Sequence, residues 1–257
     1  MWKKVDIFLL ILLLSNIAKA QNNPGLDYFS QGISVKFGYG YHAVQDEFIS
    51  KEKYSGNSSW LSIDWSKIHG ATGFHLWLDV VNSANITNYS ISAQLTTFEM
   101  SVAYLYQIGK VTLFDKPFNI LAGPAPEFFC YYRAQNIARG GAAILDAFSL
   151  AGLLSLSLRL NFIYPIQNRL RLESSIQSNV ISLAGKFIDP RDKDDSFLKV
   201  LTLLKALNVA NDISVSYCLS HRLAFEGSYK FTLLRIKAWD DLLAASDIVY
   251  FGVMLRL

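Results

Sequence analysis

Hydrophobic and polar residues alternate strictly between positions 154 and 164. The apolar side chains fall on every second residue: Leu154, Leu156, Leu158, Leu160, Phe162 and Tyr164. Polar residues such as Ser155, Ser157 and Arg159 occupy most of the places between them. Because successive side chains of a strand point to opposite faces of a sheet, this pattern predicts a strand with one apolar and one polar face. The apolar face needs an apolar neighbour, either a second sheet or lipid.

The same alternation recurs along the chain and predicts ten strands. Their ranges are 32–44, 60–67, 73–81, 98–108, 117–133, 149–164, 169–180, 212–220, 222–234 and 248–257. The connections after odd strands are long, and most of those after even strands are short. An even number of strands, each of about ten residues and tilted by about 40°, covers the ~25 Å apolar band of an outer membrane. We therefore expect an all-β fold, a transmembrane antiparallel up-and-down β-barrel, with eight or twelve strands as alternatives.

Three segments leave their structure open. Residues 85–97 fit a loop, or an extension of the fourth strand with a bulge near Thr96 that shifts the alternation. Pro124 and Pro126 lack backbone donors, so we expect a bulge or bend in the fifth strand. Residues 197–209 fit either a short amphipathic helix or an extra length of strand.

The first twenty residues predict a signal peptide. Lys3 and Lys4 precede an apolar core from position 7 to 14, and Ala18 and Ala20 fit a small-residue cleavage site. The core is too short to span a bilayer as a helix. We expect cleavage after Ala20, with residues 21–257 forming a single barrel domain.

Composition and charge limit the classes of function that fit this chain. The formal charge of +3 includes three Lys and one Asp of the first twenty residues, which leaves +1 for the rest. This charge implies neither nucleic acid nor an acidic partner. Hydrophobic residues reach 51%, yet no uninterrupted apolar run is long enough for a spanning helix. Cys130 and Cys218 fall on different predicted strands, and we expect two small apolar residues rather than a disulfide.

The signal peptide, the alternating strands and the last strand, IVYFGVMLRL, together resemble bacterial outer-membrane β-barrel proteins of about ten strands. The resemblance covers nearly all of residues 21–257 and points to the class rather than to one family. It implies a location in the outer membrane, contact with outer-membrane lipid and lipopolysaccharide, and insertion by the barrel-assembly machinery. Leu257 stands where the last strand of these proteins usually ends in Phe.

Charged residues on the polar faces are predicted to line the lumen. The basic ones are Lys36, Arg133, Arg159, Arg171, Lys230 and Arg256, and the acidic ones are Asp64, Asp79, Glu99, Glu127, Glu173 and Glu226. Six charges of each sign favour a structural network of ion pairs, because buried charges persist only when paired. A selective pore more often carries an excess of one sign.

Catalysis is the main alternative from another class. His42 and His75 are expected to face inward, His69 lies in a turn, and Ser220, His221 and Glu226 could form a hydrolase site. His221, however, falls at a predicted periplasmic turn, whereas known barrel hydrolases of the lipid A deacylase and omptin kinds place their groups near or above the outer leaflet. Asp240 and Asp241 alone fit a solvated loop better than a catalytic pair.

No motif for a metal, a cofactor or a phosphate loop is present, and we expect neither metal nor cofactor. Lys51, Lys53 and Tyr54, together with the loop around Trp239, could meet lipopolysaccharide phosphates, although ordinary loop polarity explains them as well. The sequence thus predicts an integral outer-membrane barrel with a structural or small-solute transport role and a charge-filled lumen. The alternatives are a membrane-embedded hydrolase acting on lipid A or peptides, and a soluble periplasmic β-sandwich.

Overall fold

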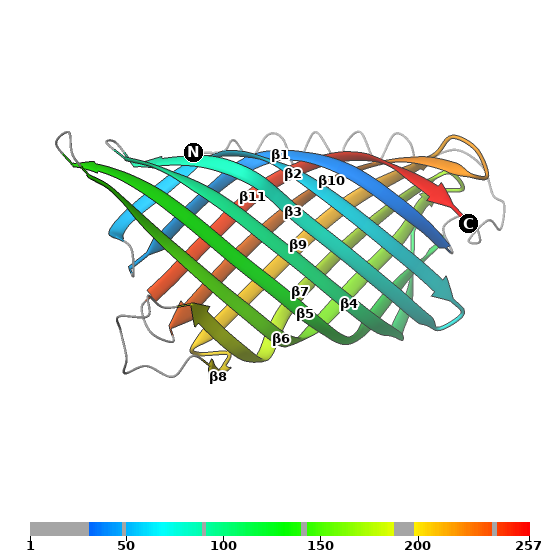
Figure 1. Ribbon diagram of the computed structural model, residues 1–257. Coiled ribbons are helices and arrows are strands. Elements are labelled where there is room, and N and C mark those ends of the chain that lie inside the picture. The colour runs from blue at the N-terminus through cyan, green and yellow to red at the C-terminus, as the bar shows by residue number, and fades with distance from the viewer. Residues whose placement is uncertain (1–30, 48–49, 89–90, 140–142, 188–197, 238–240) are drawn as a thin grey trace.

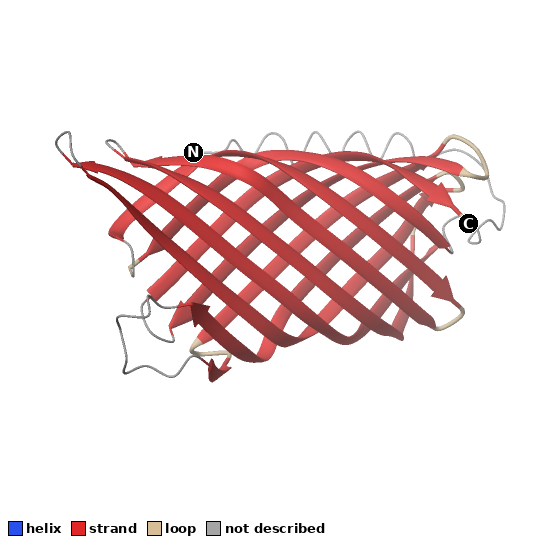
Figure 2. Cartoon of the chain, in the orientation of Figure 1, coloured by secondary structure: helices blue, strands red, loops and turns tan. Residues whose placement is uncertain are grey.

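The computed structural model describes residues 31–47, 50–88, 91–139, 143–187, 198–237 and 241–257. The described chain consists of strands and turns, and it forms one closed antiparallel barrel (Figures 1 and 2). The strands are β1 Gln31–Asp46, β2 Ser50–His69, β3 Thr72–Asn88, β4 Ile91–Leu113, β5 Lys116–Arg139, β6 Ala143–Gln167, β7 Leu170–Phe187, β8 Leu198–Thr202, β9 Ala206–Cys218, β10 Leu223–Lys237 and β11 Asp241–Arg256. Among these residues no helix is long and apolar enough to cross a membrane.

Ten of these strands form the ring. Each pairs with its neighbours in the chain, β9 takes the place beside β7, and the pairing of β1 with β11 closes the barrel. The short strand β8 pairs with the last part of β7, from Ile181 to Gly185. The predicted fold class and the count of ten barrel strands are therefore confirmed.

The two ends of the barrel differ. We call the end where β1 begins and β11 finishes the terminal end, and the opposite end the loop end; in Figure 1 they lie on the right and the left. Tight turns join strands at the terminal end, as between His69 and Thr72. In the turn from β4 to β5, Phe114 and Asp115 have φ angles of 48° and 63°. This left-handed pair is typical of the two-residue hairpin turns that match strand twist.

The strands are longer than predicted at the loop end, so the loops expected at 45–59 and 135–148 were wrong: β1 and β2 take in most of residues 45–59, and β5 and β6 take in most of 135–148. For residues 85–97 the alternative of a strand extension is confirmed, since β3 and β4 take in most of them. The bulge expected near Thr96 lies instead on β3, between Val81 and Ala84. Residues 197–209 contain strand β8 and the start of β9 rather than a helix.

The reason for this error is an inversion of the pattern along several strands. In the middle of the barrel the outward residues are apolar and the inward ones polar, whereas at the loop end Tyr54, Ile86 and Leu95 point inward and are 0% exposed. Exposed polar residues such as Asn57 and Gln94 lie between or beside them. A polar outer face and an apolar inner face are what a barrel wall needs once it leaves the bilayer.

A belt of exposed apolar side chains surrounds the middle of the barrel. On β1 it comprises Ile33, Val35, Phe37, Tyr39 and Tyr41, which are 39%, 41%, 69%, 62% and 44% exposed. Comparable exposed residues lie on the other ring strands, including Leu154 to Leu160 on β6 and Val249 to Leu255 on β11. Such a continuous apolar belt is far larger than the patches that soluble monomers expose.

Proline interrupts one ladder. The β4–β5 pairing is missing between the pairs Ser101–Glu127 and Tyr106–Ala122, but the register is the same on both sides. Pro124 and Pro126 lie in this gap and cannot donate toward β4, while their pairing with β6 is continuous. The irregularity expected here is thus an unpaired window without a shift of register.

Candidate functional site: the lumen

The alternation of the strands directs the predicted charges into the lumen. Nine of the twelve side chains are buried: Lys36, Asp79, Glu99, Glu127, Arg133, Arg159, Arg171, Glu226 and Lys230. Asp64 and Glu173 are half-buried, and Arg256 is half-buried at the terminal end. Each charge on a strand of period two reaches the lumen because its two neighbours face outward.

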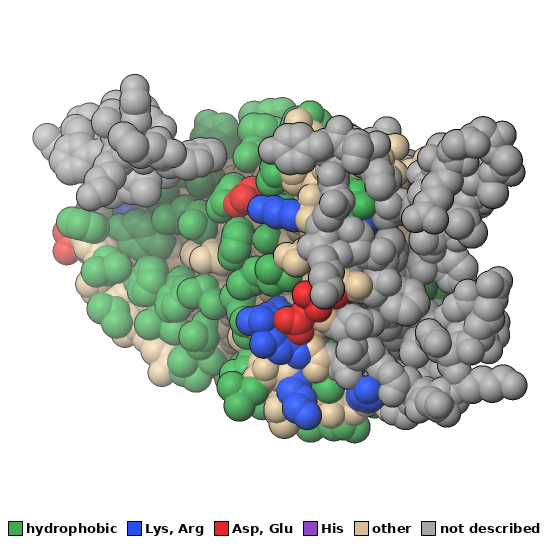
Figure 3. All heavy atoms as spheres, turned by 90° about the vertical axis from the view of Figure 1, so that its left-hand side faces the viewer, with side chains coloured by type: hydrophobic (Ala, Val, Ile, Leu, Met, Phe, Trp, Pro, Cys, Tyr) green, Lys and Arg blue, Asp and Glu red, His purple; other side chains and the backbone are tan. Residues whose placement is uncertain are grey.

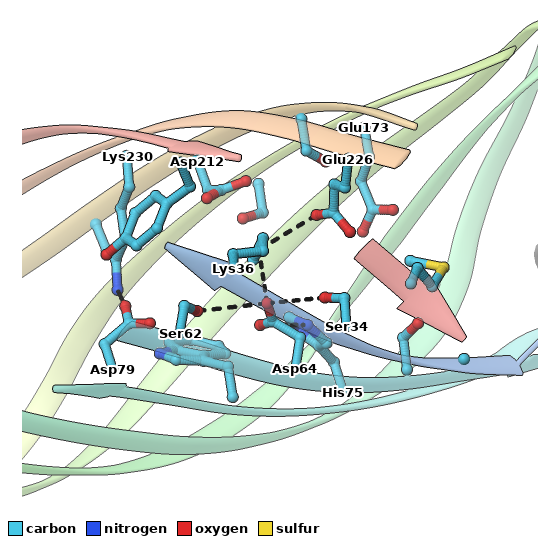
Figure 4. Close-up of a pocket in the computed structure, with 18 of the residues that line it drawn as sticks. Ser34, Lys36, Ser62, Asp64, His75, Asp79, Glu173, Asp212, Glu226 and Lys230 are labelled. Atoms are coloured by element: carbon cyan, nitrogen blue, oxygen red, sulfur yellow. Dashed lines mark hydrogen bonds and ion pairs between the residues drawn. The ribbon is translucent and has the colours of Figure 1, made fainter. Parts of the chain in front are cut away.

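Lys36 is the centre of one polar group. Its Nζ lies 2.6 Å from Asp64 Oδ2 and 3.2 Å from Glu226 Oε1. Asp64 also accepts hydrogen bonds of 3.4 Å from Ser34 and Ser62, and its other oxygen lies 3.5 Å from His75 Nε2. Figure 4 shows Lys36 reaching between the two carboxylates, which come from β2 and β10. Lys36 on β1 therefore bridges two carboxylates that lie on either side of the β1–β11 pair.

Lys230 is the centre of a second group nearer the loop end. Its Nζ lies 2.6 Å from Asp79 Oδ2 and 3.0 Å from Glu99 Oε2. The same ammonium is 5.4 Å from the ring centroid of Trp77, and the guanidinium of Arg159 is 4.5 Å from that ring. The indole thus lies beside two cations, a cation–π arrangement that suits charges removed from water.

Glu127 is held mainly by neutral donors. It accepts hydrogen bonds from Ser157 at 3.0 Å and from Gln177 at 2.8 Å, and a further one from Asn208. These donors come from β6, β7 and β9, so the carboxylate links β5 to three later strands.

The remaining predicted charges lie toward the two ends. Arg171 Nη2 is 3.0 Å from Glu173 Oε2 near the terminal end, and Asn161 donates to Glu173 at 2.8 Å. Arg256 donates to the carbonyl of Ser220 at 3.3 Å. Arg133 lies deeper in the loop half, where its guanidinium is 4.0 Å from the ring centroid of Tyr54.

A cavity of about 60 Å³ opens among the first two groups. Its lining extends from Gly32 and Met254, close to the terminal end, to Trp77 and Lys230 in the middle of the barrel. Since a buried water occupies ~15 Å³ of such space, the cavity has room for about four waters. It is therefore large enough for solvent and too small for a sugar or a peptide.

Asp212 lines this cavity and was missed as a lumen charge. It lies on β9, where Ser214 and Ser216 face inward. Asp212 begins the predicted strand 212–220, and the alternation of that strand places it inside. With Asp212, the carboxylates lining the cavity outnumber the lysines and arginines by five to four: Asp64, Asp79, Glu173, Asp212 and Glu226 against Lys36, Arg159, Arg171 and Lys230.

Above the charged layer, a hydrophobic cluster fills the loop half of the lumen; we call it the loop-end core. All eleven strands contribute to it, through Val44, Tyr54, Trp60, Val81, Ile86, Ala93, Leu95, Tyr131, Ala151, Leu153, Ala184, Leu201, Ala206, Leu234, Ile236, Leu242, Ala244, Ile248 and Tyr250. None of these side chains is more than 7% exposed. This core was not predicted: nine of its residues, among them Val44, Leu153 and Tyr250, lie in predicted strands whose inner faces were read from their polar residues, and the other ten lie outside those strands.

The histidines do not assemble one site. His42 lies in the lumen with its ring centroid 6.3 Å from that of Trp60, and both ring nitrogens are buried without a hydrogen-bond partner. His75 pairs with Asp64, whereas His69 and His221 lie at turns of the terminal end. Ser220 and His221 are exposed there, and Glu226 is bound to Lys36 inside the barrel. The arrangement therefore does not bring the proposed Ser220, His221 and Glu226 together as a triad.

The residues considered for lipopolysaccharide contact do not lie together on one surface. Lys53 is exposed, but Tyr54 points into the loop-end core and is 0% exposed. Trp239 and Asp240 lie outside the described residues, as does the predicted signal peptide. Tyr54 was assigned to the surface because its segment was read as a loop, and the strand places it inside.

Neither cysteine forms a disulfide. Cys130 is half-buried and lies on the outward side of β5, as do the exposed Phe128 and Tyr132, whereas Cys218 is buried inside with Ala224 and Met254. Side chains on opposite faces of the wall cannot be bridged. Within the described part of the chain, no group of three or more His, Cys, Asp or Glu is placed to hold a metal ion.

Comparison with known proteins gives a match of fold and none of sequence. No family model and no curated protein sequence matches the chain. The fold is similar to the outer membrane protease OmpT from Escherichia coli, with a TM-score of 0.54 and 8% identity over 93% of this chain and 100% of that one. It is also similar to the translocator domain of the autotransporter NalP from Neisseria meningitidis, with a TM-score of 0.51 and 9% identity over 98% and 96%.

A third similar structure is the beta domain of the Bordetella autotransporter BrkA, with a TM-score of 0.50 and 10% identity over 89% of this chain and 100% of that one. The chain therefore has the fold of bacterial outer-membrane β-barrels, as the resemblance implied. At such low identities the likeness concerns the fold alone.

Proposed function

We propose that this protein is a sealed outer-membrane β-barrel with a structural role, a rigid scaffold that holds its loop end beyond the bilayer. The apolar belt supports the membrane location, because lipid is the partner that such a belt requires. An even number of strands, with both chain ends and the tight turns together, supports a periplasmic terminal end.

The loop-end core is the observation that supports a closed lumen. Conduction needs a continuous aqueous path or a hydrophobic constriction that can open. Here the lumen contains a charged layer with a cavity of about 60 Å³ and, above it, side chains at most 7% exposed from every strand. A core of this kind is packed like the interior of a soluble domain, and it favours a scaffold over small-solute transport.

The length of the strands supports the scaffold role. A span of about ten residues crosses the apolar band, yet β5 and β6 contain 24 and 25 residues. The surplus extends mainly toward the loop end, and there the outer faces of β2, β4 and β10 are polar and their inner faces apolar. The barrel wall thus continues outside the bilayer as a stiff platform.

Conductance in planar bilayers tests this proposal. We expect no steady open-channel current from the folded protein, and a leak from the double variant Tyr54→Ala and Tyr131→Ala, which removes two buried rings of the loop-end core. The matched control Phe37→Ala and Phe251→Ala removes two rings from the outer belt and should stay closed. A shift in gel mobility on boiling confirms that each sample is folded. Steady current from the unaltered, folded protein would refute the sealed lumen.

A further inference from the structure

Three basic side chains gather on the outer face of the loop end. Lys205 follows β8, and Arg235 and Lys237 end β10; all three are exposed. The backbone N–H of Lys237 donates to the carbonyl of Lys205 at 2.7 Å, so these two residues are direct cross-strand neighbours. Figure 3, which looks at the loop end, shows Lys and Arg side chains beside the hydrophobic outer surface. We call Lys205, Arg235 and Lys237 the outer cation cluster.

Among the described residues, positive charge exceeds negative charge around this cluster. Asp241 lies 3.3 Å from Arg235 and pairs directly with Lys237 in the β10–β11 ladder, and its carbonyl accepts a hydrogen bond from the backbone N–H of the exposed Glu47. Two carboxylates beside three cations leave an excess of one positive charge. Like charges directly opposite each other on neighbouring strands destabilise a sheet, so an anion bound here would relieve the repulsion between Lys205 and Lys237.

Apolar side chains lie beside the cluster. In the ladder Arg235 pairs with Leu207 on β9 and with Leu243 on β11, and Leu243 is 40% exposed. Beside Lys205, Leu203 and Leu204 are 44% and 90% exposed in the turn between β8 and β9. At this exposure the side chain of Leu204 does not pack in the core, and its position on the outer surface allows contact with acyl chains.

Along the barrel axis, apolar side chains of β10 are followed by basic ones, in the same order as the acyl chains and head groups of a lipid leaflet. On β10 the outward side chains run from Tyr229 and Phe231 in the belt to Leu233, and then to Arg235 and Lys237. At ~3.3 Å per residue and a tilt of about 40°, Arg235 lies ~10 Å above Phe231 along the barrel axis. Along β10 the cations therefore stand where the apolar band ends and lipid head groups begin.

We propose that the outer cation cluster binds the phosphate of a phosphorylated glycolipid in the outer leaflet, while Leu203, Leu204 and Leu243 contact its acyl chains. Ammonium and guanidinium groups form strong charge-assisted hydrogen bonds with phosphate oxygens. This inference rests on the proposed membrane orientation, in which the loop end faces outward. It names a lipid as the ligand because the cations adjoin exposed leucines rather than a pocket for a free ion.

Lipid binding to the full-length mature protein in detergent tests the site, with native mass spectrometry as the readout. The probes are lipid A with both phosphates, dephosphorylated lipid A and inorganic phosphate. We expect Lys205→Gln with Lys237→Gln to weaken binding of phosphorylated lipid A about thirty-fold, since a basic residue near an anionic lipid surface contributes ~1 kcal/mol. The matched control Lys67→Gln with Arg222→Gln removes two exposed cations from the terminal end and should bind as the unaltered protein does.

Two further measurements separate the sources of binding. Leu204→Gln should weaken lipid A binding without a change of charge, and inorganic phosphate should not displace the lipid. Equal binding by the Lys205 and Lys237 variant, or equal binding of dephosphorylated lipid A, would overturn the proposal. Displacement by inorganic phosphate would indicate a free-anion site instead. Conductance and the gel shift on the same samples report on the sealed barrel independently, so the two proposals can fail separately.

Discussion

At the scale of single residues, the lumen is organised by lysines that each hold two carboxylates. Lys36 joins residues 28 positions later and 190 positions later in the chain, and Lys230 joins Asp79 and Glu99 across the barrel. A buried charge that loses its partners is costly, whereas a whole network replaced by apolar side chains is often neutral. The network therefore stabilises the barrel only while every buried charge has its partner.

Replacing Lys230 by methionine should destabilise the barrel by about 3–5 kcal/mol, because Asp79 and Glu99 would stay buried without a cation. Urea unfolding in detergent, followed by the gel shift, measures this loss. Adding Asp79→Asn and Glu99→Gln to Lys230→Met should restore most of the stability. An unchanged midpoint for the single variant would contradict the role of Lys230.

Gly123 permits a close approach of two backbones beside the proline window. A Cβ at this position would lie 1.9 Å from the carbonyl oxygen of Tyr104, whereas at Gly152 the nearest atom would be 4.0 Å away. Gly123→Ala should therefore force β4 and β5 apart and lower the unfolding midpoint, while Gly152→Ala should leave it within the error of the same urea titration. Equal midpoints for the two variants would show that the approach is unimportant.

At the scale of elements, β2, β4 and β10 change their polarity pattern along their length. The central part is apolar outside and polar inside, and the loop-end part is the reverse. Depth along a strand should therefore decide how well a charge is tolerated on the outer face.

Phe37→Lys introduces a cation on the outer belt of β1, where Phe37 is 69% exposed, and should destabilise the folded barrel by about 2–4 kcal/mol in lipid bilayers. Leu243→Lys, beside Arg235 at the edge of the belt, should cost only ~0–1 kcal/mol. Unfolding of both variants from liposomes gives the comparison. Equal losses at the two depths would argue against the proposed position of the bilayer.

At the scale of the whole molecule, closure depends on the pairing of the first and last strands. The β1–β11 ladder runs from Gly32–Arg256 to Asp46–Leu242. In a background without Cys130 and Cys218, cysteines at Val35 and Val253 should form a disulfide, because directly paired residues lie within bridging distance. The boiled, unreduced product should migrate differently from its reduced form. Cysteines at Val35 and Val215, on β1 and β9, should not cross-link, and a bridge there would exclude this ring.

The sequence determined the central parts of the ten ring strands, their number, and which side chains of those parts face inward. Period-two alternation is a local property, so it could be read for Lys36, Arg159 and Lys230 without any knowledge of their neighbours. Even the missed Asp212 follows from the same rule. The loop-end parts of the strands were not predicted because polar residues such as Asn57 and Gln94 face water there. A strand with a polar outer face resembles a loop in sequence.

Only the tertiary structure decided which charges meet and where the lumen closes. Lys36 bonds to Glu226, and Glu127 accepts hydrogen bonds from Gln177 and from Asn208, because ring closure and strand register bring distant segments together. The loop-end core likewise needs all the strands, since no single strand supplies more than a few of its side chains. Alternation is set by bonds between neighbouring residues, whereas pairing across the lumen is set by the curvature and stagger of the closed sheet.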